Sequence, residues 1–464
     1  MMKNKFIIGF LTILVFYSCS DSELELAPED QLTQDVAFSN ESLALGVLTG
    51  VYSSAQQDDV LNGTWQLASD WQADNIDFVG SFPTFNEVKN YTTLSDNTSI
   101  AGLWDDSYET IGTANLVIKN VPLVEDADFT DEERANAVAQ AKFMRALVYF
   151  NLSNWYAQPV QVSNGTDLAV PLVLEPFEGE VTFPSRATLN EVQAQIERDL
   201  LEALPGLTDA DNSVATLGAA QALLARLYLY QEKWGQAADF ANRAINNAAY
   251  DLASDYNFYN TQSNEFYFVL VNTAADGQDS GQGFSGLSNP TPNGRGDAPY
   301  SPNLIAAFEE EAGDLRYSAL TQVGTDALGA TRPFSSKFPE AVNNSDNAPV
   351  LRVTEMYLTR AEANLRGNTS IGGVTPVQDI NELRQRAGLD DLDSVTLEQI
   401  LNERRKELCF EGLRRMDLLR NNLNLRRAGQ NNVTESAPGQ PKVIFPIPVN
   451  ELDLNENLVQ NPGY

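Results

Sequence analysis

Apolar residues recur at helical spacing over several long stretches of the chain. The clearest stretch runs from Thr130 to Tyr156, where acidic residues come first and alanine, valine, phenylalanine and leucine follow at intervals of three and four. A second stripe begins at Thr188 and stops at Pro205-Gly206, a pair that ends helices. Both stretches are predicted to be amphipathic helices.

The segment from Gly218 to Ala249 has a more specific pattern. Small alanines and large aromatic residues, such as Ala225 and Trp234, follow one another at the spacing of tetratricopeptide repeats, in which two antiparallel helices pack closely. Residues 354–389 predict a similar pair, interrupted at Gly367. One such hairpin cannot bury both of its faces alone, so several should stack. We therefore predict a mainly α fold with tetratricopeptide-like helical repeats.

Two interior stretches, residues 62–97 and 273–347, are rich in turn-forming residues and have little helical periodicity. The first mixes aromatic residues with aspartate and asparagine, and the second is rich in glycine, asparagine and proline. Between them, Phe266 to Val271 predicts a short strand. We expect long irregular loops and short strands, inserted into a single domain that spans residues 19–464.

The amino terminus has the features of a secretory signal. Lys3 and Lys5 precede an apolar run over residues 6–17, which is shorter than the about 20 residues that a membrane-spanning helix needs, and Cys19 follows. A cysteine directly after the cleavage point is what bacterial lipoprotein processing requires. The sequence therefore predicts a signal peptide over residues 1–18 and a lipid on Cys19, with an ordinary secreted protein as the alternative.

Composition rules out several kinds of chemistry. The chain has no histidine, which excludes imidazole general bases, Ser-His-Asp triads and histidine-ligated metals. If Cys19 carries lipid, Cys409 has no disulfide partner and is expected to be a small buried hydrophobic residue. With 30 basic against 64 acidic residues, the net charge of -34 repels nucleic acid. We predict no catalytic residues, no cofactor and no metal site.

The carboxyl-terminal quarter carries three further motifs. They are a charged segment from Glu403 to Leu418, interpreted as one helix, a stiff segment from Phe445 to Pro448, and the terminal residues Gln460 to Tyr464. The helical pair contributes Ala361 to Ala363 and Arg386 to Leu389. Together these motifs resemble the SusD/RagB family of starch-utilisation-type outer-membrane lipoproteins.

The resemblance implies a fold and a function. Members of this family bind oligosaccharides or polysaccharides at the outer face of the outer membrane in Bacteroidetes-type bacteria, and they pass the glycan to a TonB-dependent transporter of the SusC type. It implies a SusD-like fold, an anchor in the outer membrane through the lipid on Cys19, and no catalysis. Two alternatives remain, a tetratricopeptide adaptor that binds a peptide or protein and a glycosidase that uses two carboxylates.

The ligand site is expected in residues 62–97. A loop tryptophan flanked by aspartate and asparagine can stack on a sugar while its neighbours bind the hydroxyls, and Trp71 is the preferred platform. The alternative is that these rings pack into the helical body. Between Trp65 and Tyr91 only Lys89 is basic, which favours a neutral glycan. The candidate site residues are Trp65, Asp70, Trp71, Asp74, Asn75 and Tyr91.

Overall fold

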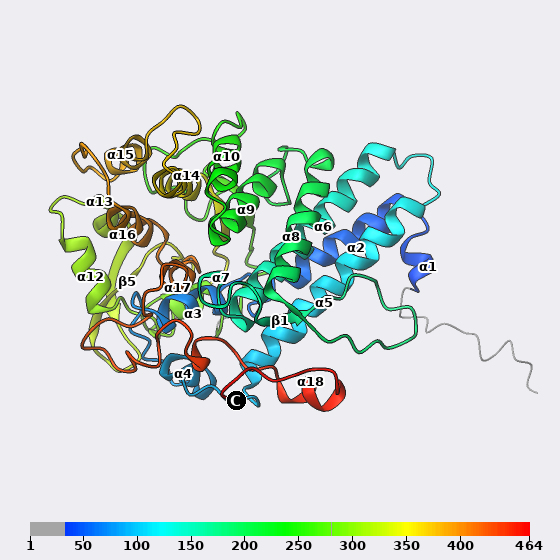
Figure 1. Cartoon of the computed structure of the whole chain (residues 1–464), viewed down its shortest axis with the longest axis horizontal. Coiled ribbons are helices and arrows are strands. Elements are labelled where there is room, and N and C mark those ends of the chain that lie inside the picture. The colour runs from blue at the N-terminus through cyan, green and yellow to red at the C-terminus, as the bar shows by residue number, and fades with distance from the viewer. Residues whose placement is uncertain (1–32, 280) are drawn as a thin grey trace, which may run out of the picture.

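Helices are the main regular elements of the chain in the computed structural model, which describes residues 33–279 and 281–464 (Figure 1). The α-helices are α1 (Gln34–Ala37), α2 (Glu41–Ala55), α3 (Thr64–Gln72), α4 (Pro83–Asn90), α5 (Thr98–Asn120), α6 (Asp131–Tyr156), α7 (Val160–Ser163), α8 (Leu189–Ala203), α9 (Leu217–Tyr230), α10 (Trp234–Ile245), α11 (Phe284–Ser288), α12 (Pro302–Glu309), α13 (Leu315–Leu320), α14 (Val353–Gly367), α15 (Pro376–Arg386), α16 (Leu397–Leu408), α17 (Arg414–Leu419) and α18 (Val449–Leu454). Short 3₁₀ helices are η2 (Val121–Leu123), η3 (Leu204–Gly206) and η4 (Pro441–Val443). The strands are β1 (Leu168–Pro171), β2 (Arg186–Thr188), β3 (Phe266–Leu270), β4 (Thr321–Thr325), β5 (Thr331–Ser335) and β6 (Ala348–Arg352).

The two predicted amphipathic helices are confirmed, and both begin with a capping box. At the start of α6, the Glu133 backbone N–H donates to the Thr130 hydroxyl at 3.2 Å, and the Glu133 carboxylate accepts the Thr130 N–H at 2.9 Å. Thr188 and Glu191 make the same pair of hydrogen bonds at the start of α8. These side chains satisfy N–H groups that the first turn of a helix leaves unpaired.

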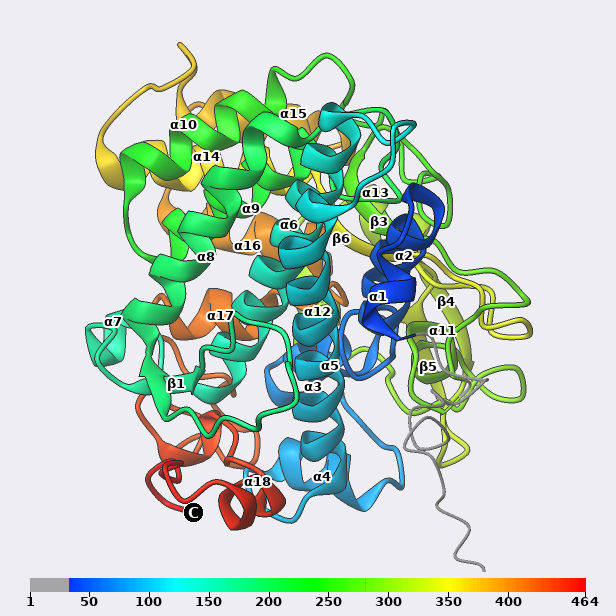
Figure 2. The ribbon, with the colours of Figure 1, turned by 90° about the vertical axis from the view of Figure 1, so that its right-hand side faces the viewer.

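The helices stack one on the next, as a repeat architecture requires. In order of packing, α2 lies on α5, α5 on α6, α6 on α8, α8 on α9, α9 on α10 and α10 on α14 (Figure 2). Small residues allow the close approach. Gly206 in η3, for example, sits against α6, where a Cβ atom would come within 2.7 Å of the Ala135 carbonyl oxygen. The predicted helical pairs α9–α10 and α14–α15 are both confirmed.

The two stretches predicted to be loop-rich contain more structure than expected. Residues 62–97 include α3 and α4, and residues 273–347 include α11 to α13 and an antiparallel hairpin of β4 and β5. Nearly every residue of α3 is buried, so this helix has no polar face and no amphipathic period to read in the sequence. The strand predicted from Phe266 is confirmed as β3, which pairs with β6.

The charged segment from 403 to 418 is not one helix. It divides into α16 and α17, because the backbone turns through left-handed conformations at Phe410 (φ 68°) and Gly412 (φ 85°). Nor do its charges pair along a helix surface. The Glu403 carboxylate is buried and binds Arg316 at 2.6 Å, an ion pair between distant parts of the chain. Cys409 lies in the break and is buried, as expected.

The terminal motifs act as a structural clasp. The ring of Phe445 stacks on Trp155 of α6, with centroids 4.5 Å apart and planes 5° apart. Asn461 then donates from Nδ2 to the carbonyls of Phe445 at 2.6 Å and Tyr156 at 2.9 Å. The end of the chain is thereby fixed to the middle of the helical stack. Among the described helices, none combines the length and the hydrophobicity that crossing a bilayer needs.

Candidate functional site

The predicted aromatic platform lies in the interior of the protein. Trp71 is 0% exposed and packs against Phe78 at 4.7 Å and Phe85 at 5.3 Å, measured between ring centroids. Trp65 is equally enclosed, 5.8 Å from Trp155. A stacking platform needs an exposed ring face. The prediction that Trp71 stacks on a sugar is therefore wrong, and the alternative, that these rings pack into the helical body, is confirmed.

Asp74 is an internal counter-ion rather than a hydroxyl-binding group. It accepts two hydrogen bonds from Arg414, at 2.7 and 2.9 Å, and one from Arg427 at 2.6 Å, while Arg405 lies at 3.3 Å. Burial alone would raise the pKa of Asp74, but the charges of Arg414, Arg405 and Arg427 hold it well below its usual range. This carboxylate ties α3 to α16, α17 and the segment after them.

The other predicted polar residues also serve the interior. Asp70 accepts the backbone N–H of Phe410 at 3.0 Å and the Asn75 amide at 2.6 Å. Burial raises the pKa of Asp70 to about 6. The Tyr91 hydroxyl donates to the carbonyl of Gln72 at 2.5 Å. Asp70, Asn75 and Tyr91 are buried and bound within the protein, so they are also corrected from ligand-binding to structural residues.

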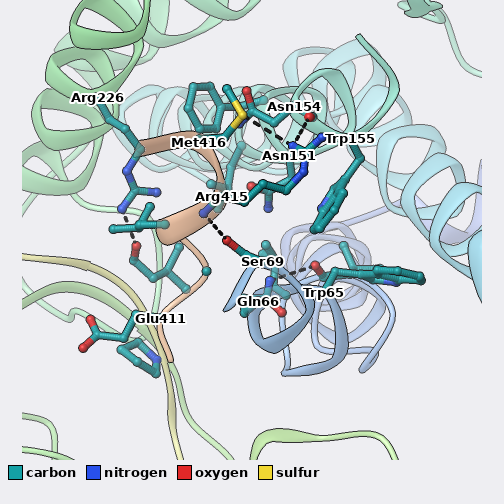
Figure 3. A pocket seen from close by; sticks show the side chains of 18 of the residues that line it. Trp65, Gln66, Ser69, Asn151, Asn154, Trp155, Arg226, Glu411, Arg415 and Met416 are labelled. Carbon is teal, nitrogen blue, oxygen red and sulfur yellow. Dashed lines mark hydrogen bonds between the residues drawn. The ribbon is translucent and has the colours of Figure 1, made fainter. Parts of the chain in front are cut away.

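An interior cavity lies beside Trp65, between α3, α6, α9 and the start of α17 (Figure 3). Its volume is about 60 Å³, whereas pockets for small molecules usually enclose roughly 300–1,000 Å³. Arg415 crosses it and donates to Gln72 Oε1 and to the Asn154 carbonyl, both at 2.7 Å. The cavity has room for a few water molecules but not for a sugar.

A different set of residues gathers at the surface, where three loops meet. Phe82, just before α4, is only partly buried, and the guanidinium of Arg295 lies 4.3 Å from the centre of its ring. Gly281, which follows Asp279 in the next loop, lies near the edge of this ring, since a Cβ atom on Gly281 would be 3.9 Å from Cζ of Phe82. The aromatic ring thus has a cation on one side and the backbone at Gly281 beside it.

Two carboxylates after α2 complete this group. The Asp58 Oδ2 atom accepts the backbone N–H of Asp279 at 2.7 Å, while Oδ1 of Asp58 and Oδ1 of Asp59 are enclosed by the protein and have no hydrogen-bond partner among the described residues. Burial, with the nearby charge of Asp279, raises the pKa of Asp58 to about 7. Burial and the charge of Asp106 raise that of Asp59 to about 7.

We call Asp58, Asp59, Phe82, Asp279 and Arg295 the loop-face site. Partly exposed carboxylates beside a partly exposed ring suit a sugar, because its hydroxyls donate hydrogen bonds and its C–H face packs on aromatic carbon. Sequence reasoning missed the site. Its only local signal is the adjacent acidic pair between α2 and the glycine at 63.

Comparison with known proteins identifies the family. Residues 334–464 match the model of the SusD family, and residues 24–229 match a model described as "Starch-binding associating with outer membrane". The chain belongs to the SusD/RagB family. SusD proteins bind glycans and are not catalysts, so this membership places the chain among binding proteins.

Relatives match the SusD-like chain along most of its length. SusD-like protein P2 of Formosa agariphila is 28% identical, with 100% of both chains covered. A crystal structure of a SusD superfamily protein from Bacteroides thetaiotaomicron is 26% identical and has a TM-score of 0.81, covering 90% of this chain and 99% of that one. A laminarin binding SusD-like protein is 26% identical with a TM-score of 0.75, covering 92% and 100%. The predicted mainly helical fold with few short strands is confirmed.

Proposed function

We propose that this SusD-like protein captures an oligosaccharide or polysaccharide at the outer face of the outer membrane and passes it to a SusC-type TonB-dependent transporter. Two findings support the location and the ligand class. One matching model is described as associating with the outer membrane, and the names of two relatives refer to laminarin and to starch. The lipid anchor on Cys19 remains part of the proposal, because residues 1–32 lie outside the described part of the chain.

The observation that carries the ligand assignment is the loop-face site. A sugar ring placed on Phe82 would lie beside Arg295, whose guanidinium donates to hydroxyl oxygens. The carboxylates of Asp58 and Asp59, which are partly exposed, would accept hydroxyl hydrogens. Ring stacking contributes about 0.5–1.5 kcal/mol and each hydrogen bond about as much. A short glycan that makes several such contacts would bind in the micromolar to millimolar range, as transient capture before transfer requires.

The charges of the loop-face site favour a neutral glycan. Asp58, Asp59 and Asp279 are acidic, and Arg295 is already bound to Asp297 at 2.7 Å. A polyanion would meet repulsion from these carboxylates in a protein whose overall charge is -34. The ligand proposed for this site is therefore an uncharged oligosaccharide.

Titration calorimetry of the purified protein with a panel of neutral glucans, including laminarin and soluble starch oligosaccharides, tests the proposal. We expect saturable binding to at least one of them. Binding to polypeptides with none to glycans would favour the adaptor alternative. Release of reducing ends during incubation would favour the glycosidase alternative.

Native-membrane extraction tests the transfer step. Mild detergent should extract the protein together with a TonB-dependent barrel, because a lid that delivers glycan must remain on its transporter. Recovery of the protein alone, whether or not glycan is present, would contradict the proposed partner.

A further inference from the structure

Positive charge concentrates in one region of this acidic protein. Arg405, Arg414 and Arg427 all converge on the single carboxylate of Asp74. Arg426 lies next to them in sequence, and its guanidinium donates only to backbone carbonyls in the described residues, at 2.8, 2.8 and 3.0 Å. Three guanidinium groups thus share one acidic partner, and the fourth has none among the described residues. A buried or half-buried charge without a counter-ion is costly, so this surplus needs solvent or a bound anion.

A groove opens beside three of these arginines. It lies between α16, α17 and the segment that follows α17, and its volume is about 670 Å³. Arg405, Arg414 and Arg427 line it, together with the side-chain amides of Asn402 and Asn421. This volume is within the usual range of roughly 300–1,000 Å³ for ligand pockets.

The carboxylates of the groove have partners of their own. Glu310 accepts a hydrogen bond from Asn402 at 2.7 Å, and Asp417 pairs with Arg404 at 3.1 Å and Arg420 at 2.7 Å. Glu398 also lines the groove and is exposed to solvent. Within residues 33–279 and 281–464, the arginines that bind Asp74 form no ion pair with Glu310, Asp417 or Glu398 at 4 Å or less. Asp417 still acts on Arg414, because burial alone would lower the pKa of Arg414, but the charge of Asp417, with those of Asp74 and Asp70, raises it. The surplus positive charge therefore lies on Arg405 and Arg427.

Several donors of the three arginines remain free. Arg414 uses Nε and Nη2 on Asp74, Arg405 uses Nε on Asn75 and Nη2 on the Asp74 carbonyl, and Arg427 uses Nε alone. Their other nitrogens make no hydrogen bond within the described chain, and Arg427 is the most accessible of the three, with 27% of its side chain exposed against 8% for Arg405 and 9% for Arg414. Burial and the charges of Arg414 and Arg427 lower the pKa of Arg405 to about 10 in spite of Asp74, which agrees with a shortage of negative charge.

We propose that this arginine groove binds an oxyanion carried by a glycan, either the carboxylate of a uronic acid or a sulfate ester, through the free guanidinium edges of Arg405, Arg414 and Arg427. Guanidinium presents a planar pair of donors that matches two oxygens of such a group. The amides of Asn402 and Asn421 are suited to the hydroxyls of the same sugar. The groove shares no residue with the loop-face site, so this is a second site that would extend recognition to charged glycans.

Titration calorimetry with three tetrasaccharides tests the proposal on the full-length protein. They are an oligogalacturonate, a sulfated galactan fragment and neutral maltotetraose. We expect one or both acidic ligands to bind, with an affinity that falls as salt is added, because charge pairs at the surface are screened. Arg427→Gln should weaken acidic binding about tenfold or more, since a charge-assisted hydrogen bond is lost. Arg427→Lys keeps the charge but not the planar donors, so its affinity for the acidic ligands should lie between that of the wild type and that of Arg427→Gln.

Arg198→Gln is the matched control. Arg198 is exposed on α8, forms no ion pair in the described chain and carries the same charge, so its loss should leave acidic binding unchanged. Equal acidic binding by wild type and Arg427→Gln would overturn the proposal. So would binding of hexaglutamate with no binding of acidic glycans, because the groove would then be a protein-docking surface. Loss of neutral-glucan binding with intact acidic binding would count only against the loop-face site.

A thermal melt provides a second measurement in case Arg427→Gln fails to fold. Inorganic sulfate should raise the Tm of the wild-type protein more than chloride does at equal ionic strength, because only sulfate fits between the guanidinium groups. Equal shifts with both salts would overturn the site.

Discussion

Replacing Phe82 by alanine removes the only aromatic surface of the loop-face site while leaving its carboxylates in place. The ring is partly exposed, with Arg295 at 4.3 Å on one side and Phe85 at 4.9 Å on another. The variant should lose ring stacking on the sugar and the apolar area that the sugar covers. We estimate about 1.5–2.5 kcal/mol for the two together, which corresponds to an affinity about 10- to 70-fold lower.

The effect on stability should be small by comparison. Phe82 contributes one edge of an aromatic cluster whose centre, Trp71 and Phe78, is untouched by the substitution. Loss of a partly buried ring at the rim should reduce the free energy of unfolding by about 1 kcal/mol. Calorimetric titration with the best neutral glucan and a thermal melt of the same sample separate the two effects.

Phe177→Ala is the control for this experiment. Phe177 is 66% exposed in the loop between β1 and β2, so its removal deletes an equal ring from another surface. Glucan binding should be unchanged in that variant. If Phe82→Ala binds glucan as tightly as the wild type, or if Phe177→Ala weakens binding equally, the assignment of the loop-face site is refuted.

Three further predictions address the anchor, the core and the titrating carboxylates. Cys19→Ala should move the protein from the membrane fraction to the soluble fraction, because each buried methylene of an acyl chain contributes about 0.8 kcal/mol to membrane binding. A variant that still sediments with outer membranes would contradict the lipid anchor. Asp74→Asn should lower the free energy of unfolding, measured in urea, by about 3–5 kcal/mol, since it leaves three arginines without their buried counter-ion. An unfolding free energy equal to that of the wild type would show that solvent already balances the charges of these arginines. Burial and the charge of Asp279 raise the pKa of Asp58 to about 7, so the folded protein holds this proton more tightly than the unfolded chain does. The stability that this group contributes is therefore present at low pH and is lost as pH rises through about 7. Asp58→Asn should therefore reduce the fall in Tm between about pH 5 and pH 8. An unchanged dependence of Tm on pH would show that the pKa of Asp58 is not raised to about 7.

The sequence predicted helices from two kinds of signal, an apolar stripe in α6 and α8 and the repeat spacing of small and aromatic residues in α9 and α10. In α6 and α8 the apolar stripe and the capping boxes at Thr130 and Thr188 are local signals, and the structure follows them closely. α3 was not predicted because it is buried on all sides, which removes the periodic signal. The break after α16 was hidden for another reason, since nothing in the sequence marks Phe410 as a left-handed residue.

The ligand site was less predictable than the fold. Tryptophan beside aspartate and asparagine describes a sugar platform, but it describes a buried ring beside a buried ion pair equally well, and only the tertiary structure distinguishes Trp71 from Phe82. The partner of Asp74 is more than 300 residues away along the chain. The loop-face site brings together the turn after α2, the residue before α4 and the loop around Arg295, and no spacing rule connects these segments.

A crystal structure of the protein with a neutral oligosaccharide that binds in solution tests the central claim most directly. We predict that a sugar ring lies on Phe82 beside Arg295, with hydroxyl groups within hydrogen-bond distance of Asp58 and Asp59. A ligand bound at another surface, with Phe82 uncovered and both carboxylates uncontacted, would contradict the loop-face site as the place where this SusD family member captures its glycan.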